Sequence, residues 1–265
     1  MIVNIHTPNK DFDWFIRQYK FIYSAPNEIV YDKFISREHV ALAFHLGSRP
    51  YLSGDKSIQL PRFFLSPIKQ YARQIKFPGN LSTFIVICNP TILSKIFNIN
   101  LDKIEFPYSE LSSELFSSLW EELVKCDSEE SRIKCFQEFL TGIGIFKYKH
   151  DVIDNFYNKI INEWRETPLS QIENSFGLSE RTLQRKFRTR TGVTPKTLIR
   201  IIRINHIMHK LKKVEVPDYQ SIVFEGNYFD QTHFIKDFKA ITGETPDCFF
   251  KRDLLHVKTL SVMEQ

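Results

Sequence analysis

The pattern TGVTP at residues 191–195 recurs as TGETP at residues 242–246, 51 residues further along the chain. The similarity extends upstream in the same register, where Phe187 aligns with Phe238. Self-similarity of this kind indicates one supersecondary unit that is used twice. The nature of that unit decides the fold of the second half of the chain.

The first copy, residues 168–195, has the pattern of two short helices joined by a tight turn. Gly177 is able to adopt positive φ in the turn, and Ser179 is a favourable N-cap for the second helix. In that helix Leu183 and Phe187 lie four residues apart and face inward. The outward arc carries basic and amide side chains: Arg181, Gln184, Arg185 and Arg188. This spacing predicts a helix-turn-helix, whose second helix enters the major groove of DNA.

The second copy, residues 218–246, repeats the design. Asn227 stands in the turn and Asp230 in the cap, and Phe234 and Phe238 face inward. The outward candidates are Gln231, Thr232, His233 and Lys236. Arg can bond O6 and N7 of guanine, and Gln can bond N6 and N7 of adenine, so these residue types suit base reading. A long helix over 195–213 is expected to join the copies and to let both enter successive major grooves, ~34 Å apart.

Charge is segregated along the chain. Residues 179–213 carry eleven Lys and Arg against one acid, whereas residues 105–138 carry nine acids against three bases. A basic stretch of this density indicates a polyanionic partner. Because most protein–DNA hydrogen bonds go to the backbone, Arg188, Arg190 and Lys196 are predicted to contact phosphates.

The first 105 residues are predicted to be mainly β. Short apolar runs at 40–46, 63–65 and 84–88 alternate with turn signals. Flanking helices are expected over 11–23 and 91–97. The fold class is therefore α+β, with a mainly β N-terminal domain, a helical connector and an all-α C-terminal domain.

The connector, residues 106–165, has a leucine every four residues from 111 to 123, and a second helix follows the cap signal at Asp127 and Ser128. These amphipathic helices fit two roles equally well, covering a core or forming a dimer interface. The expected domains are 1–105 as a sensor, 106–165 as the connector, 166–252 as the DNA reader and 253–265 as a tail.

At residues 169–252 the chain resembles the C-terminal DNA-binding domain of the AraC/XylS family of bacterial transcriptional regulators. The motifs that carry the resemblance are GLS at 177–179, LQRKF at 183–187, FDQTHF at 229–234 and the two TG-x-TP patterns. The resemblance implies base reading by the outward residues already named: Arg181, Gln184 and Arg185, then Gln231, Thr232, His233 and Lys236. Glu173 departs from the family, which usually has a small alanine at this position. Its side chain must turn to solvent or pair with a basic residue.

The resemblance also implies partners. These are double-stranded promoter DNA, RNA polymerase, an effector of small-molecule size bound by the N-terminal domain, and a second copy of the chain in a homodimer. Some family relatives are alkylation-repair methyltransferases, which is the alternative function. That enzyme needs a reactive-cysteine motif and a four-cysteine zinc site, and this chain shows neither.

Other classes of protein are disfavoured by composition. The four cysteines are scattered, so reduced thiols are expected, and we expect no catalytic residue, no cofactor and no metal site. His39 and His45 lack the spacing of a metal-ligand motif and are interpreted as ordinary histidines. No run of about 18 apolar residues occurs and no signal pattern begins the chain, so we expect a cytoplasmic protein without a membrane span.

Overall fold

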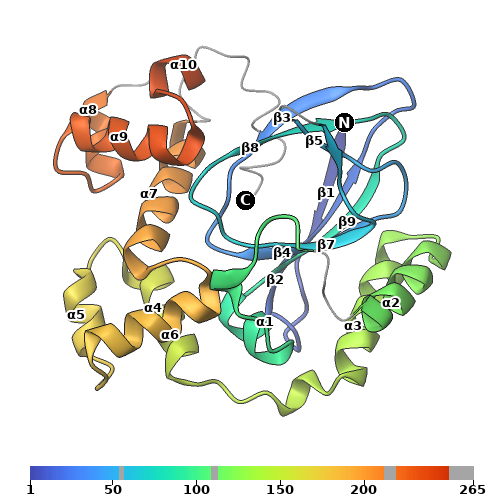
Figure 1. Ribbon diagram of the computed structural model, residues 1–265, viewed down its shortest axis with the longest axis horizontal. Helices are drawn as coiled ribbons and strands as arrows, with labels where there is room; N and C mark the ends of the chain where they lie inside the picture. Colours follow the sequence, from blue (N-terminus) through green and yellow to red (C-terminus); the bar gives the residue numbers. More distant parts are fainter. Residues whose placement is uncertain (54–56, 109–112, 212–218, 251–265) are drawn as a thin grey trace.

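The computed structural model describes residues 1–53, 57–108, 113–211 and 219–250, and the expected tail 253–265 lies outside them. Two antiparallel β-sheets form the N-terminal part (Figure 1). The larger sheet has the order β1-β2-β9-β4-β7, with bounds Ile2–His6, Ile16–Tyr23, Ser82–Cys88, Val40–His45 and Phe63–Ser66. The smaller has the order β3-β8-β5-β6, with bounds Val30–Phe34, Arg73–Phe77, Tyr51–Ser53 and Ile58–Gln59. The α+β class is confirmed.

Successive side chains of each strand in the larger sheet point to opposite faces, and both faces are covered. On β9, Thr83, Ile85 and Ile87 line a cavity toward the smaller sheet. Phe84 points the opposite way and meets Phe136 edge to face at 6.1 Å. One face of this sheet therefore belongs to an inter-sheet cavity, and the other to a helical layer.

The helical layer is made by α2 (Ser113–Lys125) and α3 (Glu129–Gly142). Phe116 and Leu119 of α2 and Phe136 of α3 are buried against the sheet. Ser128 caps α3 in a capping box, as its sequence signal predicts. Of the two roles left open for these helices, the structure shows core cover. Leu111, the first residue of the leucine stripe, lies outside the described residues.

The helix expected over residues 11–23 is wrong, because residues 16–23 form strand β2. This strand pairs with β1 on one side and β9 on the other, and its apolar side chains are buried on both faces of the sheet. A strand of that kind has apolar residues in a nearly continuous run, and Phe15, Tyr19 and Ile22 by chance repeat at helical spacing. The strands expected at 40–46, 63–65 and 84–88 correspond to β4, β7 and β9, and the helix at 91–97 to α1 (Pro90–Ile96).

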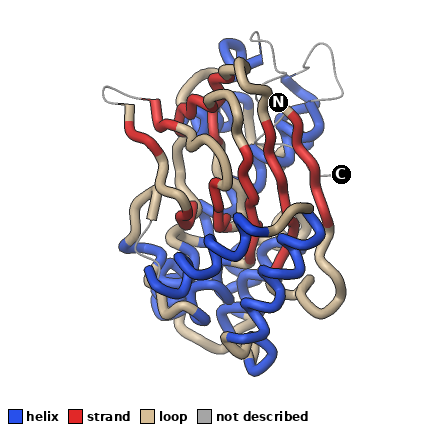
Figure 2. Tube along the Cα trace, turned by 90° about the vertical axis from the view of Figure 1, so that its right-hand side faces the viewer, coloured by secondary structure: helices blue, strands red, loops and turns tan. Residues whose placement is uncertain are grey.

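The remaining helices form the C-terminal half. They are α4 (Val152–Glu163), α5 (Leu169–Asn174), α6 (Glu180–Thr191), α7 (Pro195–Leu211), α8 (Tyr219–Glu225), α9 (Gln231–Thr242) and α10 (Pro246–Phe250). The short 3-10 turn η2 (Ile145–Lys147) precedes α4, and a second 3-10 turn, η1 (Leu101–Lys103), follows α1 in the N-terminal half. Figure 1 shows α7 running from α5 and α6 toward the group α8, α9 and α10. In Figure 2 the strands run side by side, with many of the helices packed against one end of them. One continuous hydrophobic core joins the larger sheet, α4 and both helical groups.

Candidate nucleic-acid interface

The first helix-turn-helix consists of α5 and α6. Gly177 in the turn has φ +63°, and Ser179 accepts a hydrogen bond from the backbone N–H of Thr182 at the start of α6. Leu183 and Phe187 are fully buried, and Phe187 meets Phe156 of α4 edge to face at 5.2 Å. The turn, the cap and the inward face predicted for this unit are thus present.

The opposite face of α6 is open to solvent. Arg181 and Arg185 are exposed, and Gln184 between them is half-buried. These side chains line a hollow in the surface together with Asp102, which belongs to η1 in the N-terminal half. The predicted base readers of the first unit therefore lie together on one accessible surface.

Glu173 of α5 is turned away from solvent, and no basic side chain among the described residues forms an ion pair with it. The residue is only 7% exposed, and its Oε1 accepts a hydrogen bond from Nε2 of Gln184 at 2.8 Å. The same Nε2 donates to Oε1 of Glu180 at 2.9 Å. Glu173 is four residues after Leu169 and three before Phe176, so its inward register was readable from helical spacing.

The second helix-turn-helix consists of α8 and α9. Asn227 takes φ +52° in the turn, and Asp230 accepts a hydrogen bond from the backbone N–H of His233 at 2.7 Å. Phe234 and Phe238 are fully buried, and their rings are 5.6 Å apart. The predicted outward residues are all exposed on one helix: Gln231, Thr232, His233 and Lys236. Asp218, at the start of the second copy, lies outside the described residues.

A buried carboxylate sets the attachment of α9 to the long helix α7. Asp237 is 5% exposed, and its Oδ1 accepts a hydrogen bond from Nε of Arg200 on α7 at 2.8 Å. His233 lies beside it, with Nε2 3.7 Å from Oδ2 of Asp237. We call the two helix-turn-helix units, α5–α6 and α8–α9, the first and the second reader. The ion pair between α7 and α9 constrains the orientation of the second reader relative to the first.

The residues predicted to contact phosphate are in three different environments. Lys196 is exposed in the first turn of α7. The side chain of Arg188 is 56% exposed and donates from Nε to Oδ1 of Asp102 at 2.6 Å. Arg190 is 14% exposed and points into the protein.

Arg190 joins the first reader to the N-terminal half. Its guanidinium donates to the carbonyl oxygen of Thr91 at 2.6 Å, to Asp151 Oδ2 at 3.0 Å, to Asp154 Oδ1 at 2.9 Å and to the hydroxyl of Tyr148 at 3.1 Å. Burial by itself would raise the pKa of Asp151, but hydrogen bonds from Lys95 and Arg190 hold that pKa well below its usual range. A structural role explains Arg190 better than a phosphate contact.

The structural role of Arg190 was readable from helical spacing, although its basic residue type suggested a contact with DNA. Arg190 follows Phe187 by three residues and Leu183 by seven, which places it on the inward face of α6. Its partners could not be read in the same way, because Asp151 and Asp154 are distant in the chain and show no motif.

The second reader also contacts the sheets. Lys33 of β3 donates from Nζ to the carbonyl oxygen of Thr242 at 2.9 Å and to Glu244 Oε1 at 2.5 Å. The backbone N–H of Ala72 donates to the carbonyl oxygen of Ile241 at 2.8 Å. In the first reader, Gly192 lies close to the backbone of Leu101. Both repeated TG-x-TP motifs are thus places where the N-terminal half contacts the end of a recognition helix.

The described residues contain no group of three or more His, Cys, Asp and Glu side chains placed to hold a metal ion. His39 instead contacts the hydroxyl of Tyr157 at 2.7 Å, and His45 contacts Thr83 Oγ1 at 2.8 Å. No helix in the described part of the chain is long and apolar enough to cross a membrane.

Comparison with known proteins agrees with this geometry. Residues 172–252 match the sequence family described as a helix-turn-helix domain, and they form a domain of the AraC type. No curated protein sequence matches the chain.

Several solved structures match the chain at low sequence identity. ToxT from Vibrio cholerae has 11% identity and a TM-score of 0.46, covering 94% of this chain and 97% of its own. A ToxT structure with an unsaturated fatty acid bound has 14% identity and a TM-score of 0.45, covering 94% of each chain. The AraC-like transcriptional activator CuxR has 9% identity and a TM-score of 0.20, covering 89% of this chain and 80% of its own.

Proposed function

We propose that this protein is a sequence-specific transcription regulator of the AraC type that inserts α6 and α9 into successive major grooves of promoter DNA. One observation carries the proposal. Two capped recognition helices present exposed Arg, Gln, His and Lys side chains, and the long helix α7 joins them through one continuous core. A rigid connection of this kind suits a single DNA site with two separated half-sites.

The two recognition helices are unequal in charge, and this predicts unequal contributions. Arg181 and Arg185 give α6 two exposed guanidinium groups, whereas the outward set of α9 contains one lysine, Lys236. Because phosphate neutralisation supplies much of the affinity for DNA, α6 is expected to contribute more of it. Lys196 and Arg188 are the proposed phosphate contacts, the latter when its pairing with Asp102 is broken.

Selection of bound sequences from a randomised DNA pool, with the full-length protein, tests this function. The expected result is two blocks of preferred bases, centred about one helical turn apart. Genome-wide footprinting should then place the same sequence in promoters. A double variant, Arg181→Ala with Arg185→Ala, is expected to erase one block and to leave the other. Binding that is indifferent to sequence would overturn the proposal.

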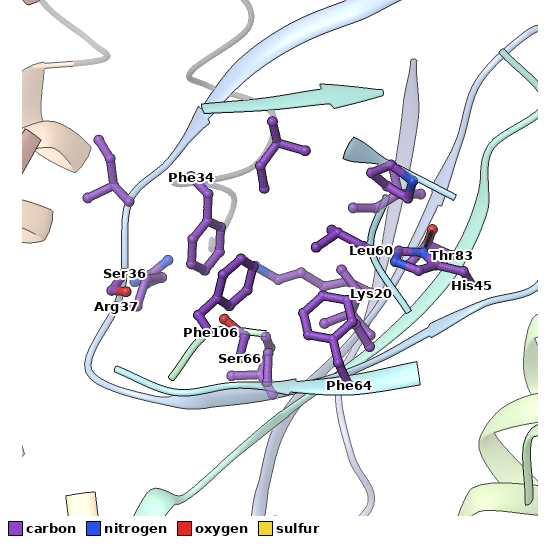
Figure 3. Close-up of a pocket in the computed structure, with 18 of the residues that line it drawn as sticks. Lys20, Phe34, Ser36, Arg37, His45, Leu60, Phe64, Ser66, Thr83 and Phe106 are labelled. Carbon is purple, nitrogen blue, oxygen red and sulfur yellow. Dashed lines mark hydrogen bonds between the residues drawn. The ribbon is translucent and has the colours of Figure 1, made fainter. Parts of the chain in front are cut away.

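We further propose that the cavity between the two sheets binds an effector. It has a volume of about 110 Å³ and is lined mainly by apolar side chains, among them Phe34, Phe64 and Phe106 (Figure 3). An apolar cavity of about 150 Å³ is large enough to bind benzene. The size and lining therefore favour a small and mostly apolar molecule.

The polar groups of the cavity indicate that this molecule carries one polar end. His45 Nε2 and Ser66 Oγ are buried and have no hydrogen-bond partner in the described structure. Burial lowers the pKa of His45 to about 3, so its imidazole is neutral. Lys20, almost fully buried, extends toward the same space (Figure 3). Unpaired buried polar atoms are costly, and a bound polar group would relieve that cost.

The cavity wall is continuous with the contacts to the DNA readers. Phe34 lines the cavity, and its neighbour Lys33 bonds the end of α9. Ser36 also lines it, and its carbonyl oxygen accepts a hydrogen bond from Asn205 of α7 at 3.2 Å. A ligand that displaces this wall therefore has a physical route to the orientation of α9.

Filling the cavity tests the effector proposal. Ala43→Leu places a larger side chain in it, and Ser118→Leu adds the same bulk on the exposed side of α2 as a control. Native mass spectrometry of the full-length protein is expected to show a bound small molecule in the wild type and in the control, but not in Ala43→Leu. An identical mass adduct in all three proteins would contradict a ligand in this cavity.

RNA polymerase and a second copy of the chain are further partners proposed for a promoter-bound regulator. Since Phe116 and Leu119 of α2 and Phe136 of α3 are buried, a homodimer through this region would have to use the outer sides of these helices, where Leu115 and Val124 are exposed. Dimerisation stays a prediction.

A further inference from the structure

Gln184 is held by two carboxylates on the DNA-reading face of α6. Its Nε2 lies 2.8 Å from Glu173 Oε1 and 2.9 Å from Glu180 Oε1. The carboxyl oxygens accept hydrogen bonds from the amide, whose nitrogen carries two hydrogens. Both hydrogens of Gln184 are therefore engaged, and the amide is oriented with its nitrogen toward the two acids.

Glu173 is the unusual member of this group. It belongs to α5, the helix that supports the reader, and it is 7% exposed. Within the described part of the chain no basic side chain lies within ion-pair distance of it. Gln184 thus supplies the hydrogen bond that a buried carboxylate requires. Such a contact orients the amide before any DNA is present.

The orientation changes what Gln184 is able to read. A free glutamine recognises adenine with two bonds, donating to N7 and accepting from N6. With its nitrogen occupied, Gln184 retains only the carbonyl Oε1, which is an acceptor. In the major groove the donors are N4 of cytosine and N6 of adenine, whereas guanine and thymine present acceptors to the same place.

We propose that Glu173, assisted by Glu180, makes Gln184 an acceptor-only reader that takes cytosine or adenine and rejects guanine and thymine. Glu173 is then a specificity-determining residue that acts through another side chain without touching DNA. The inference rests on the proposed insertion of α6 into the major groove.

Base selection with full-length variants tests this role. Gln184→Ala first identifies the position that Gln184 reads, as the one whose preference disappears. At that position the wild type is expected to take cytosine and adenine. Glu173→Ala frees one amide hydrogen and should shift the preference from cytosine toward adenine or guanine by about fivefold or more, as expected for a gained base contact.

Two further variants keep the test decisive. Glu173→Gln retains an acceptor oxygen and is expected to keep the wild-type preference. Glu180→Ala, at an exposed position, frees the other amide hydrogen without disturbing the buried side of the unit, so it should also weaken the cytosine preference even if Glu173→Ala does not fold.

Several outcomes would overturn the inference while leaving the regulator intact. These are a wild type that accepts guanine or thymine at the mapped position, a Gln184→Ala protein with unchanged preferences at every position, or folded Glu173→Ala and Glu180→Ala proteins with wild-type preferences. Failure of every protein, including the wild type, to select any sequence would instead contradict the proposed function.

Discussion

Replacing Arg190 with alanine is expected to lower the free energy of unfolding by about 3–5 kcal/mol. Asp154, one of its partners, has a side chain that is 0% exposed, and Arg190 is the basic group that pairs with it. Removing one member of a buried ion pair leaves the other charge desolvated, and this costs more than the pair contributes. Urea denaturation of the purified full-length protein measures the loss.

Arg188→Ala is the matched control, because it removes the same side chain two residues earlier on α6. Arg188 is 56% exposed and its partner Asp102 is 31% exposed, so solvent screens the pair. Its loss is expected to cost no more than about 1 kcal/mol. Equal destabilisation by the two substitutions would show that Arg190 does not carry the special structural role assigned to it.

Replacing Arg185 with alanine is expected to cost about 1–3 kcal/mol in binding to the selected DNA site. Arg185 is exposed on α6 and lies in the surface hollow with Arg181 and Gln184. A guanidinium that bonds O6 and N7 of guanine discriminates against the other bases, so its removal should relax the preference at one base pair. Titrations on the selected site and on single-base variants measure this.

Lys196→Ala separates base reading from charge. Lys196 is a proposed phosphate contact. Its replacement should therefore weaken binding to all sequences alike and reduce the salt dependence of binding by about one counterion. Arg185→Ala should instead bring cognate and variant sites closer in affinity. If Arg185→Ala weakens cognate and scrambled DNA by the same factor, Arg185 contacts phosphate and reads no base.

The helix-turn-helix units were predictable because their signals are local. Gly177, Ser179, Asn227 and Asp230 each act on backbone within a few residues of themselves, and the structure confirms each turn and each cap. The inward residues follow from helical spacing within a single element. Such features depend little on the rest of the fold.

Strand β2 shows why the N-terminal half was harder. Its apolar residues lie in a run that fits a helix as well as a strand buried on both faces. Pairing with β1 and β9 decides between them, and those strands lie at opposite ends of the N-terminal half. The cavity between the sheets follows from the same long-range pairing, so its lining could not be assembled from the chain in order.

Arg188 and Arg190 show the difference between what the sequence determines and what the tertiary structure determines. From residue type, charge density and helical spacing, the sequence by itself determined that α6 is a basic helix with an outward polar face, and that α9 repeats it with less charge. The tertiary structure alone decided that Arg188 stays at the surface beside Asp102 while Arg190 is buried against Asp151 and Asp154. Local patterns report what one helix can present, whereas burial and ion pairing depend on what packs against it. Those partners, on η1 and at the start of α4, come from distant parts of the chain.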